Sequence, residues 1–159
     1  MAIFKDYLEN KSRLILHGAL GTEMEALGYD ISGKLWSAKY LLEKSEVIQE
    51  LHETYVAAGA DLITTSSYQA TLPGLVEAGI TEKAAEQIIA LTVRLAKAAR
   101  DKVWGALDET EKAKRPYPLI SGDVGPYAAY LANGSEYSGD YGQITIKELK
   151  DFHRPRIQI

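Results

Sequence analysis

The sequence contains no cysteine among its 159 residues, and this absence excludes two kinds of chemistry. No disulfide can form, which is typical of a protein from a reducing compartment, so we expect a cytoplasmic location. No thiolate is available either, so a soft metal ion would need ligands from outside this chain. We therefore expect no thiolate metal ligand among these positions.

Long apolar runs and a strong charge bias are missing as well. No run of about 18 apolar residues occurs, and the first residues lack the apolar segment of a secretory signal, so neither a membrane span nor an export signal is expected. Lys plus Arg number 18 and Asp plus Glu number 22, which gives a net charge of -4. Such mild acidity provides no binding surface for nucleic acid or an anionic membrane.

What the sequence does contain is an alternation of short apolar segments with helical patterns, which is typical of an α/β fold. Buried strands are predicted at Arg13–His17, Asp61–Thr65 and Pro118–Gly122. Hairpin signals are missing between them, so we expect about three parallel β-strands alternating with helices and joined by right-handed crossovers.

Apolar residues spaced three and four apart predict the main helices. One begins at Ser45, and the longest begins at Thr81 with a stripe of small and apolar residues on one face. Shorter helices are expected over Ile3–Asn10 and after Thr22, whose side chain would cap the second of them.

The segment after the third strand is harder to assign. Asp123–Gln143 is rich in Gly and Tyr and is predicted to form a long loop, which in a compact domain is usually functional. A helix is predicted over Ile144–Phe152, followed by a break and a new helical turn with Pro155 near its start.

Three parallel strands leave both edges of the sheet open, so we interpret the chain as part of a larger α/β architecture. It is too short for a complete eight-stranded α/β barrel, which needs about 250 residues. The chain stops in mid-pattern at Ile159, so a partner chain or a C-terminal portion is expected to cover the remaining edge.

In parallel α/β folds the ligand lies at the carboxyl ends of the strands. The candidate segments are therefore His17–Glu23, Thr65–Thr71 and Gly122–Tyr141, all with Gly or hydroxyl residues. His17 stands at a strand end, where a metal ligand, a general base and a simple hydrogen-bonding residue are all open interpretations. No paired-ligand spacing links the histidines, so His52 and His153 are interpreted as structural.

Seven blocks in this order resemble the homocysteine S-methyltransferase family, most closely the branch that uses S-methylmethionine or S-adenosylmethionine as methyl donor. They cover nearly the whole chain: Leu16–Met24, Leu35–Lys39, Ala58–Asp61, Ser67–Thr71, Gly122–Tyr127, Gly134–Tyr141 and Phe152–Arg156. The resemblance implies that residues 1–159 are the first half of a (β/α)8 TIM barrel that this chain does not close. It also implies methyl transfer to the sulfur of homocysteine, which gives methionine.

The resemblance further implies a zinc ion, which three cysteines of the family's C-terminal half hold and which keeps homocysteine as a thiolate. That half is missing here, so the resemblance implies no catalytic residue and no metal ligand in this chain, and we expect the chain alone to be inactive. The implied ligands are homocysteine and a methyl-sulfonium donor, and the expected protein partner is a C-terminal half or a second copy of the chain.

The same resemblance places the substrate-binding residues at the three strand exits. They are His17, Gly18, Ala19, Thr22 and Glu23 at the first exit, Ser67, Tyr68 and Gln69 at the second, Gly122 and Gly125 at the third, and Glu136 and Tyr137 over the donor pocket. His17 replaces an Asp that the family usually carries, and an imidazole cannot substitute for a carboxylate that faces an ammonium group. The Gly18 and Ala19 amides remain available for the substrate carboxylate.

Two other functions stay open from the residues alone. One is a non-catalytic half-barrel that serves as an assembly or binding module. The other is a metal-independent barrel enzyme that uses His17 as an acid or base.

Overall fold

The computed structural model describes residues 2–10, 13–32 and 36–159. Its described sheet has two parallel strands, β1 (Leu62–Thr64) and β2 (Leu119–Ser121), with Leu62 opposite Leu119. The parallel direction is as predicted, and both strands are shorter than the apolar runs that predict them.

The first predicted strand forms only an isolated bridge to β1. Leu16 pairs in parallel with Leu62, the His17 N–H donates to the Leu62 carbonyl at 3.0 Å, and the Asp61 N–H donates to the Ile15 carbonyl at 2.8 Å. The expectation of a full first strand is therefore wrong for the described residues. The segment still runs alongside β1 and delivers His17 to the same end of the sheet as Thr64.

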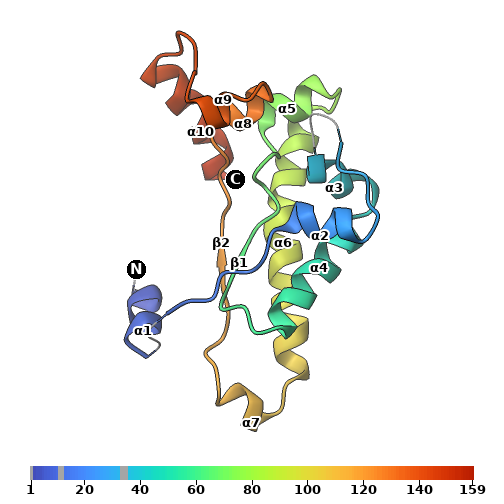
Figure 1. The fold of residues 1–159 in the computed structure, drawn as a ribbon, viewed down its shortest axis with the longest axis vertical. Helices are drawn as coiled ribbons and strands as arrows, with labels where there is room; N and C mark the ends of the chain where they lie inside the picture. The colour runs from blue at the N-terminus through green and yellow to red at the C-terminus, as the bar shows by residue number, and fades with distance from the viewer. Residues whose placement is uncertain (1, 11–12, 33–35) are drawn as a thin grey trace.

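Two long helices cover one face of the strands. α4 (Ser45–Ala57) and α6 (Glu82–Ala106) lie against each other beside the sheet (Figure 1). Ile63 of β1 packs with Val56 and Ala96 from these helices, so the apolar stripe predicted for α6 is confirmed. Thr81, the predicted first residue of this helix, is its N-cap residue, because its hydroxyl accepts the Ala84 N–H.

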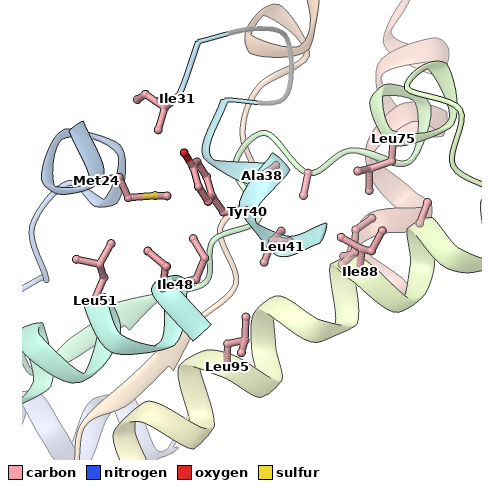
Figure 2. Close-up of a cluster of buried hydrophobic side chains, with 14 residues drawn as sticks. Met24, Ile31, Ala38, Tyr40, Leu41, Ile48, Leu51, Leu75, Ile88 and Leu95 are labelled. Atoms are coloured by element: carbon pink, nitrogen blue, oxygen red, sulfur yellow. The ribbon is translucent and has the colours of Figure 1, made fainter. Parts of the chain in front are cut away.

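A second apolar cluster joins the short helices to the long ones, as Figure 2 shows. It includes Met24, Leu41, Ile48, Leu75 and Ile88, all buried. The short elements concerned are α2 (Leu20–Ala26), the 3-10 helix η1 (Trp36–Lys39), α3 (Tyr40–Glu43) and α5 (Leu72–Glu77). This cluster holds α2 directly behind the first strand exit.

The remaining helices lie at three places around the sheet (Figure 1). α8, α9 and α10 gather toward the carboxyl ends of the strands, α7 lies at the opposite end, and α1 stands on the other side of the strands from α4 and α6. Their bounds are Ala2–Asn10 for α1, Glu109–Lys112 for α7, Tyr127–Leu131 for α8, Ser135–Ser138 for α9 and Ile146–Gln158 for α10.

Buried Asp61 ties α1 to the start of β1. Its side chain accepts the Tyr7 hydroxyl at 3.1 Å and the Ile15 N–H at 2.9 Å, and only 1% of the residue is exposed. These bonds fix the chain on both sides of the segment that leads to His17.

A row of leucines lies on the other face of the strands. Leu16 bridges to Leu62, and Leu62 is in register with Leu119, so the three side chains share one face of the sheet. Leu16 is 57% exposed, and the other two are half-buried. No described residue belongs to a strand that would cover this row.

Three local predictions are wrong. Thr22 does not cap α2, because that helix begins earlier, at Leu20, with Ala19 at its N-cap position. The predicted loop 123–143 contains α8 and α9, which end at left-handed residues Ala132 and Gly139 and are too short to show a helical stripe. α10 continues through Pro155, although the missing N–H costs it one hydrogen bond.

Candidate functional site

The three predicted exit segments meet around one cavity of about 600 Å³ at the carboxyl ends of the strands. Its walls come from segments that are far apart in the sequence. They are Leu16, His17, Gly18, Ala19, Leu20, Gly21, Thr64, Thr65, Ser66, Tyr68, Gln69, Asp123, Glu136 and Tyr137. This position is the one that parallel α/β topology predicts for a ligand.

His17 forms part of the cavity wall and is held from two sides. Its Nε2 lies 2.6 Å from the Thr64 hydroxyl, and its ring meets the rings of Tyr55 and His52 edge to face, with centroids 5.3 and 6.0 Å away. Burial lowers the pKa of His17, so the imidazole is neutral near pH 7. His17 therefore presents no charge to a ligand.

His52 lies behind His17 and is fully buried on α4. Neither ring nitrogen has a hydrogen-bond partner among the described residues. Burial, with a smaller effect from His17, lowers the pKa of His52 to about 4. Residue spacing could not connect these two histidines, because they lie on different elements.

The loop after His17 packs closely on Tyr55. A Cβ at Gly18 would lie 2.7 Å from the Tyr55 ring, and the Tyr55 hydroxyl donates to the Ala19 carbonyl at 3.2 Å. A side chain at position 18 would therefore require the Tyr55 ring to move.

A closed ring of hydrogen bonds joins the second and third strand exits. The Asp123 N–H donates to the Thr65 hydroxyl at 2.9 Å, and the Ser67 hydroxyl donates to the Asp123 carbonyl at 2.7 Å. Thr65 and Ser67 hydroxyl oxygens are 2.6 Å apart, and since the Ser67 proton is used, Thr65 is the donor between them. The two hydroxyls and the N–H and carbonyl of Asp123 are thus all hydrogen-bonded within the ring. The ring fixes the backbone of Asp123 against the end of β1.

Arg156 reinforces the same junction from α10. Its guanidinium donates to the carbonyls of Ser67 at 3.3 Å, Tyr68 at 3.2 Å and Gly125 at 2.6 Å, and the residue is 6% exposed. Burial lowers the pKa of Arg156, and the charge of Asp123 opposes this shift. The planar fork of donors suits a site where several carbonyls converge.

The two exits also touch directly. A Cβ at Gly125 would lie 2.4 Å from the Tyr68 carbonyl oxygen, so no side chain fits at this position without backbone movement. Gly125 thus has a packing role beneath the wall formed by Tyr68.

Tyr68 and Glu136 form another part of the cavity wall. The Tyr68 hydroxyl donates to the Glu136 carboxylate, and burial together with this bond raises the pKa of Tyr68. Tyr137 borders the cavity but is 89% exposed. The bond holds α9 over the second strand exit.

Seven predicted site residues line the cavity: His17, Gly18, Ala19, Tyr68, Gln69, Glu136 and Tyr137. Thr22 and Glu23 lie on α2 outside its lining, and Ser67, Gly122 and Gly125 lie behind the wall or beside it. Thr65, Ser66 and Asp123 also line it and lie inside the candidate segments Thr65–Thr71 and Gly122–Tyr141, although they are not among the predicted binding residues, and Thr64 lies just outside these segments. Arg156 could not be predicted as part of this site, because its role depends on a contact across 89 residues.

The described residues contain no group of three His, Cys, Asp or Glu side chains that could hold a metal ion. With no cysteine in the sequence, the donors present do not fit a zinc site built from thiolates. Within residues 2–10, 13–32 and 36–159, no helix is long and apolar enough to span a membrane.

These observations define an α/β protein whose ligand cavity is built by the loops that follow parallel strands. The model of the homocysteine S-methyltransferase family matches residues 14–159, and the chain belongs to this family.

Relatives from bacteria and plants agree with this assignment. The chain is 44% identical over 151 residues to homocysteine S-methyltransferase YbgG of Bacillus subtilis, which covers 95% of this chain and 47% of the relative. It is 44% identical over 146 residues to homocysteine S-methyltransferase 1 of Zea mays, covering 91% of this chain and 45% of the relative. The chain thus spans about half the length of the curated relatives it matches.

A solved structure shares the fold. The metallated form of the homocysteine methyltransferase MmuM from Escherichia coli superposes with a TM-score of 0.82 at 41% identity. The match covers 95% of this chain and 51% of that chain.

Proposed function

We propose that this chain forms the substrate-binding part of a homocysteine S-methyltransferase, which moves a methyl group from a sulfonium donor to homocysteine and yields methionine. S-methylmethionine and S-adenosylmethionine are the candidate donors. The observation that carries the proposal is the cavity at the strand exits, lined by tyrosines and carboxylates, in a chain that the family model matches from residue 14 to residue 159.

The proposed reaction is a direct displacement. The thiolate sulfur of homocysteine attacks the methyl carbon, the carbon–sulfur bond of the sulfonium breaks, and its electron pair returns to the departing sulfur. The residues described here bind and orient the two substrates, which is the contribution that proximity requires. Carboxylates and the faces of Tyr68 and Tyr137 favour cationic groups, and the Gly18 and Ala19 amides are the proposed donors to a substrate carboxylate.

The zinc ion implied by the family has no ligand set among the described residues, so we derive no step through it. The related Escherichia coli enzyme is described in a metallated form. We propose that the metal ligands come from a C-terminal half, and that the present chain is the first half of a (β/α)8 barrel. The half-length match to the relatives and the uncovered leucine row support this proposal. A cytoplasmic location stays a prediction of the sequence.

The activity test compares the chain alone with the chain mixed with a C-terminal half of the Bacillus subtilis relative. Methionine formation from homocysteine and S-methylmethionine is measured with added zinc. We expect no turnover by the chain alone and measurable turnover by the mixture. Robust turnover by the pure chain would refute the claim that essential thiolates are missing. Absence of turnover and of substrate binding in a folded mixture would refute the proposed function.

A half-barrel assembly module is the second candidate, and the leucine row favours it. Leu16 is 57% exposed and Ile15 beside it is 52% exposed, so this part of the sheet presents apolar surface. Light scattering over a range of chain concentrations tests it. A concentration-dependent dimer that Leu16→Asp abolishes supports self-association, whereas a monomer at all concentrations argues against it.

A further inference from the structure

Asp123 occupies a fixed position in the cavity wall. Its N–H and carbonyl are both held in the hydrogen-bond ring with Thr65 and Ser67, so its backbone cannot shift without breaking buried bonds. Asp123 is half-buried and is one of the residues that line the cavity. The fold thus fixes this acidic residue at a defined place between the second and third strand exits.

The Asp123 carboxylate accepts no hydrogen bond from any described residue. Arg156 is the cation whose charge acts on it, but the Arg156 donors are directed to the carbonyls of Ser67, Tyr68 and Gly125. Burial raises the pKa of Asp123, and Arg156 only partly offsets that shift. A half-buried carboxylate without donors is costly unless another group satisfies it.

The other described carboxylate that lines the cavity has a hydrogen-bond donor, and the one imidazole described there is neutral. Glu136 accepts the Tyr68 hydroxyl, and His17 is a neutral imidazole bound to Thr64. Among the described lining residues, Asp123 is therefore the carboxylate that has no hydrogen-bond donor.

We propose that Asp123 binds the cationic group of the amino-acid substrate and thereby selects cationic ligands for this cavity. The inference rests on the proposed function and deepens it, because it names the residue that recognises the charge. Both substrates carry an α-ammonium group, and the donor also carries a sulfonium. Either cation would restore the interactions that the carboxylate lost on burial, and an ammonium would add a charge-assisted hydrogen bond.

Isothermal titration of the 159-residue chain tests the proposal with Asp123→Asn, which keeps the shape and removes the charge. Glu86→Gln is the matched control, because Glu86 is exposed on α6 and remote from the cavity lining. The probes are S-methylmethionine, homocysteine, and two compounds without an ammonium group: dimethylsulfoniopropionate and 4-mercaptobutanoate.

We expect Asp123→Asn to weaken S-methylmethionine binding about tenfold or more, with Glu86→Gln unchanged. A parallel loss for homocysteine, with dimethylsulfoniopropionate unaffected, assigns the ammonium as the bound group. A loss for dimethylsulfoniopropionate assigns the sulfonium. Equal affinities in wild type and Asp123→Asn overturn the inference and leave the proposed function intact. A folded wild-type chain that binds none of the probes overturns both.

A second measurement does not depend on a variant that folds. Carbon-13 NMR of the Asp123 carboxyl group follows its titration in the wild type, with and without S-methylmethionine. We expect the bound cation to lower the raised pKa of Asp123 toward its ordinary value. An unchanged titration in the saturated complex overturns the inference.

Discussion

The Thr65 hydroxyl, on one strand exit, accepts the backbone N–H of Asp123 on the next at 2.9 Å. This bond belongs to a ring that Ser67 closes, and both hydroxyl residues are more than nine-tenths buried. The two loops therefore share one rigid polar junction, from which the cavity wall is built.

Thr65→Val is expected to destabilise the fold by about 1 to 3 kcal/mol, because the isosteric side chain leaves the Asp123 N–H without an acceptor in a buried place. Urea unfolding measures the change. Thr54→Val is the control, since Thr54 is exposed and its hydroxyl donates a hydrogen bond only to the Glu50 carbonyl in the same helix. Equal losses for the two variants would contradict the role given to the ring.

Gly125→Ala is expected to cost about 1 to 3 kcal/mol of stability, because its Cβ would lie 2.4 Å from the Tyr68 carbonyl oxygen and the backbone must move. Gly122→Ala has no heavy atom within 4 Å of its added Cβ and should stay within about 0.5 kcal/mol of wild type. Thermal unfolding compares the pair. A well-tolerated Gly125→Ala would mean that the two exits do not touch as described.

Arg156→Met is expected to lower the free energy of unfolding by about 3 kcal/mol, because three buried carbonyls lose a charged donor. Arg154→Met is the matched control, since the Arg154 side chain is 60% exposed and pairs only with Asp151 at 3.4 Å. Guanidinium unfolding measures both variants. Similar small losses would show that Arg156 does not hold the loops.

His52 predicts a loss of stability in mild acid. Its pKa is about 4 in the folded chain and near 6.5 when unfolded, so the unfolded chain binds more protons between these values and stability falls as the pH falls through them. His52→Leu removes this effect and should gain about 2 kcal/mol on wild type between pH 7 and about pH 4.5. Urea midpoints at several pH values measure the gain, and parallel pH curves for the two proteins would refute it.

The long periodic elements could be predicted from the sequence, and the site only in part. α4, α6 and the two β-strands follow from apolar spacing, because each buries a continuous face. The continuation of α10 through Pro155 could not be predicted, because α10 carries Arg156, whose contacts reach residues near position 68. Local helix propensity carries no information about such a long-range hydrogen bond.

The same limit applies within the candidate site. Their position at strand exits predicts His17, Tyr68 and Gln69 as binding residues, and all three line the cavity. The same reasoning predicts Ser67, which does not line it. Ser67 instead turns its hydroxyl to Asp123, because satisfying a buried backbone carbonyl outweighs facing the cavity. Residue type and position indicated the region, whereas the partner of each hydroxyl required the structure.

The cavity walls are drawn from the beginning, middle and end of the chain, so none of them exists as a local unit. Binding energy gained there is therefore linked to the cooperative folding transition of all these segments. A bound amino acid should therefore slow hydrogen exchange even at buried amides of α6 that do not contact it. Such protection would show that ligand binding in the cavity stabilises the whole fold.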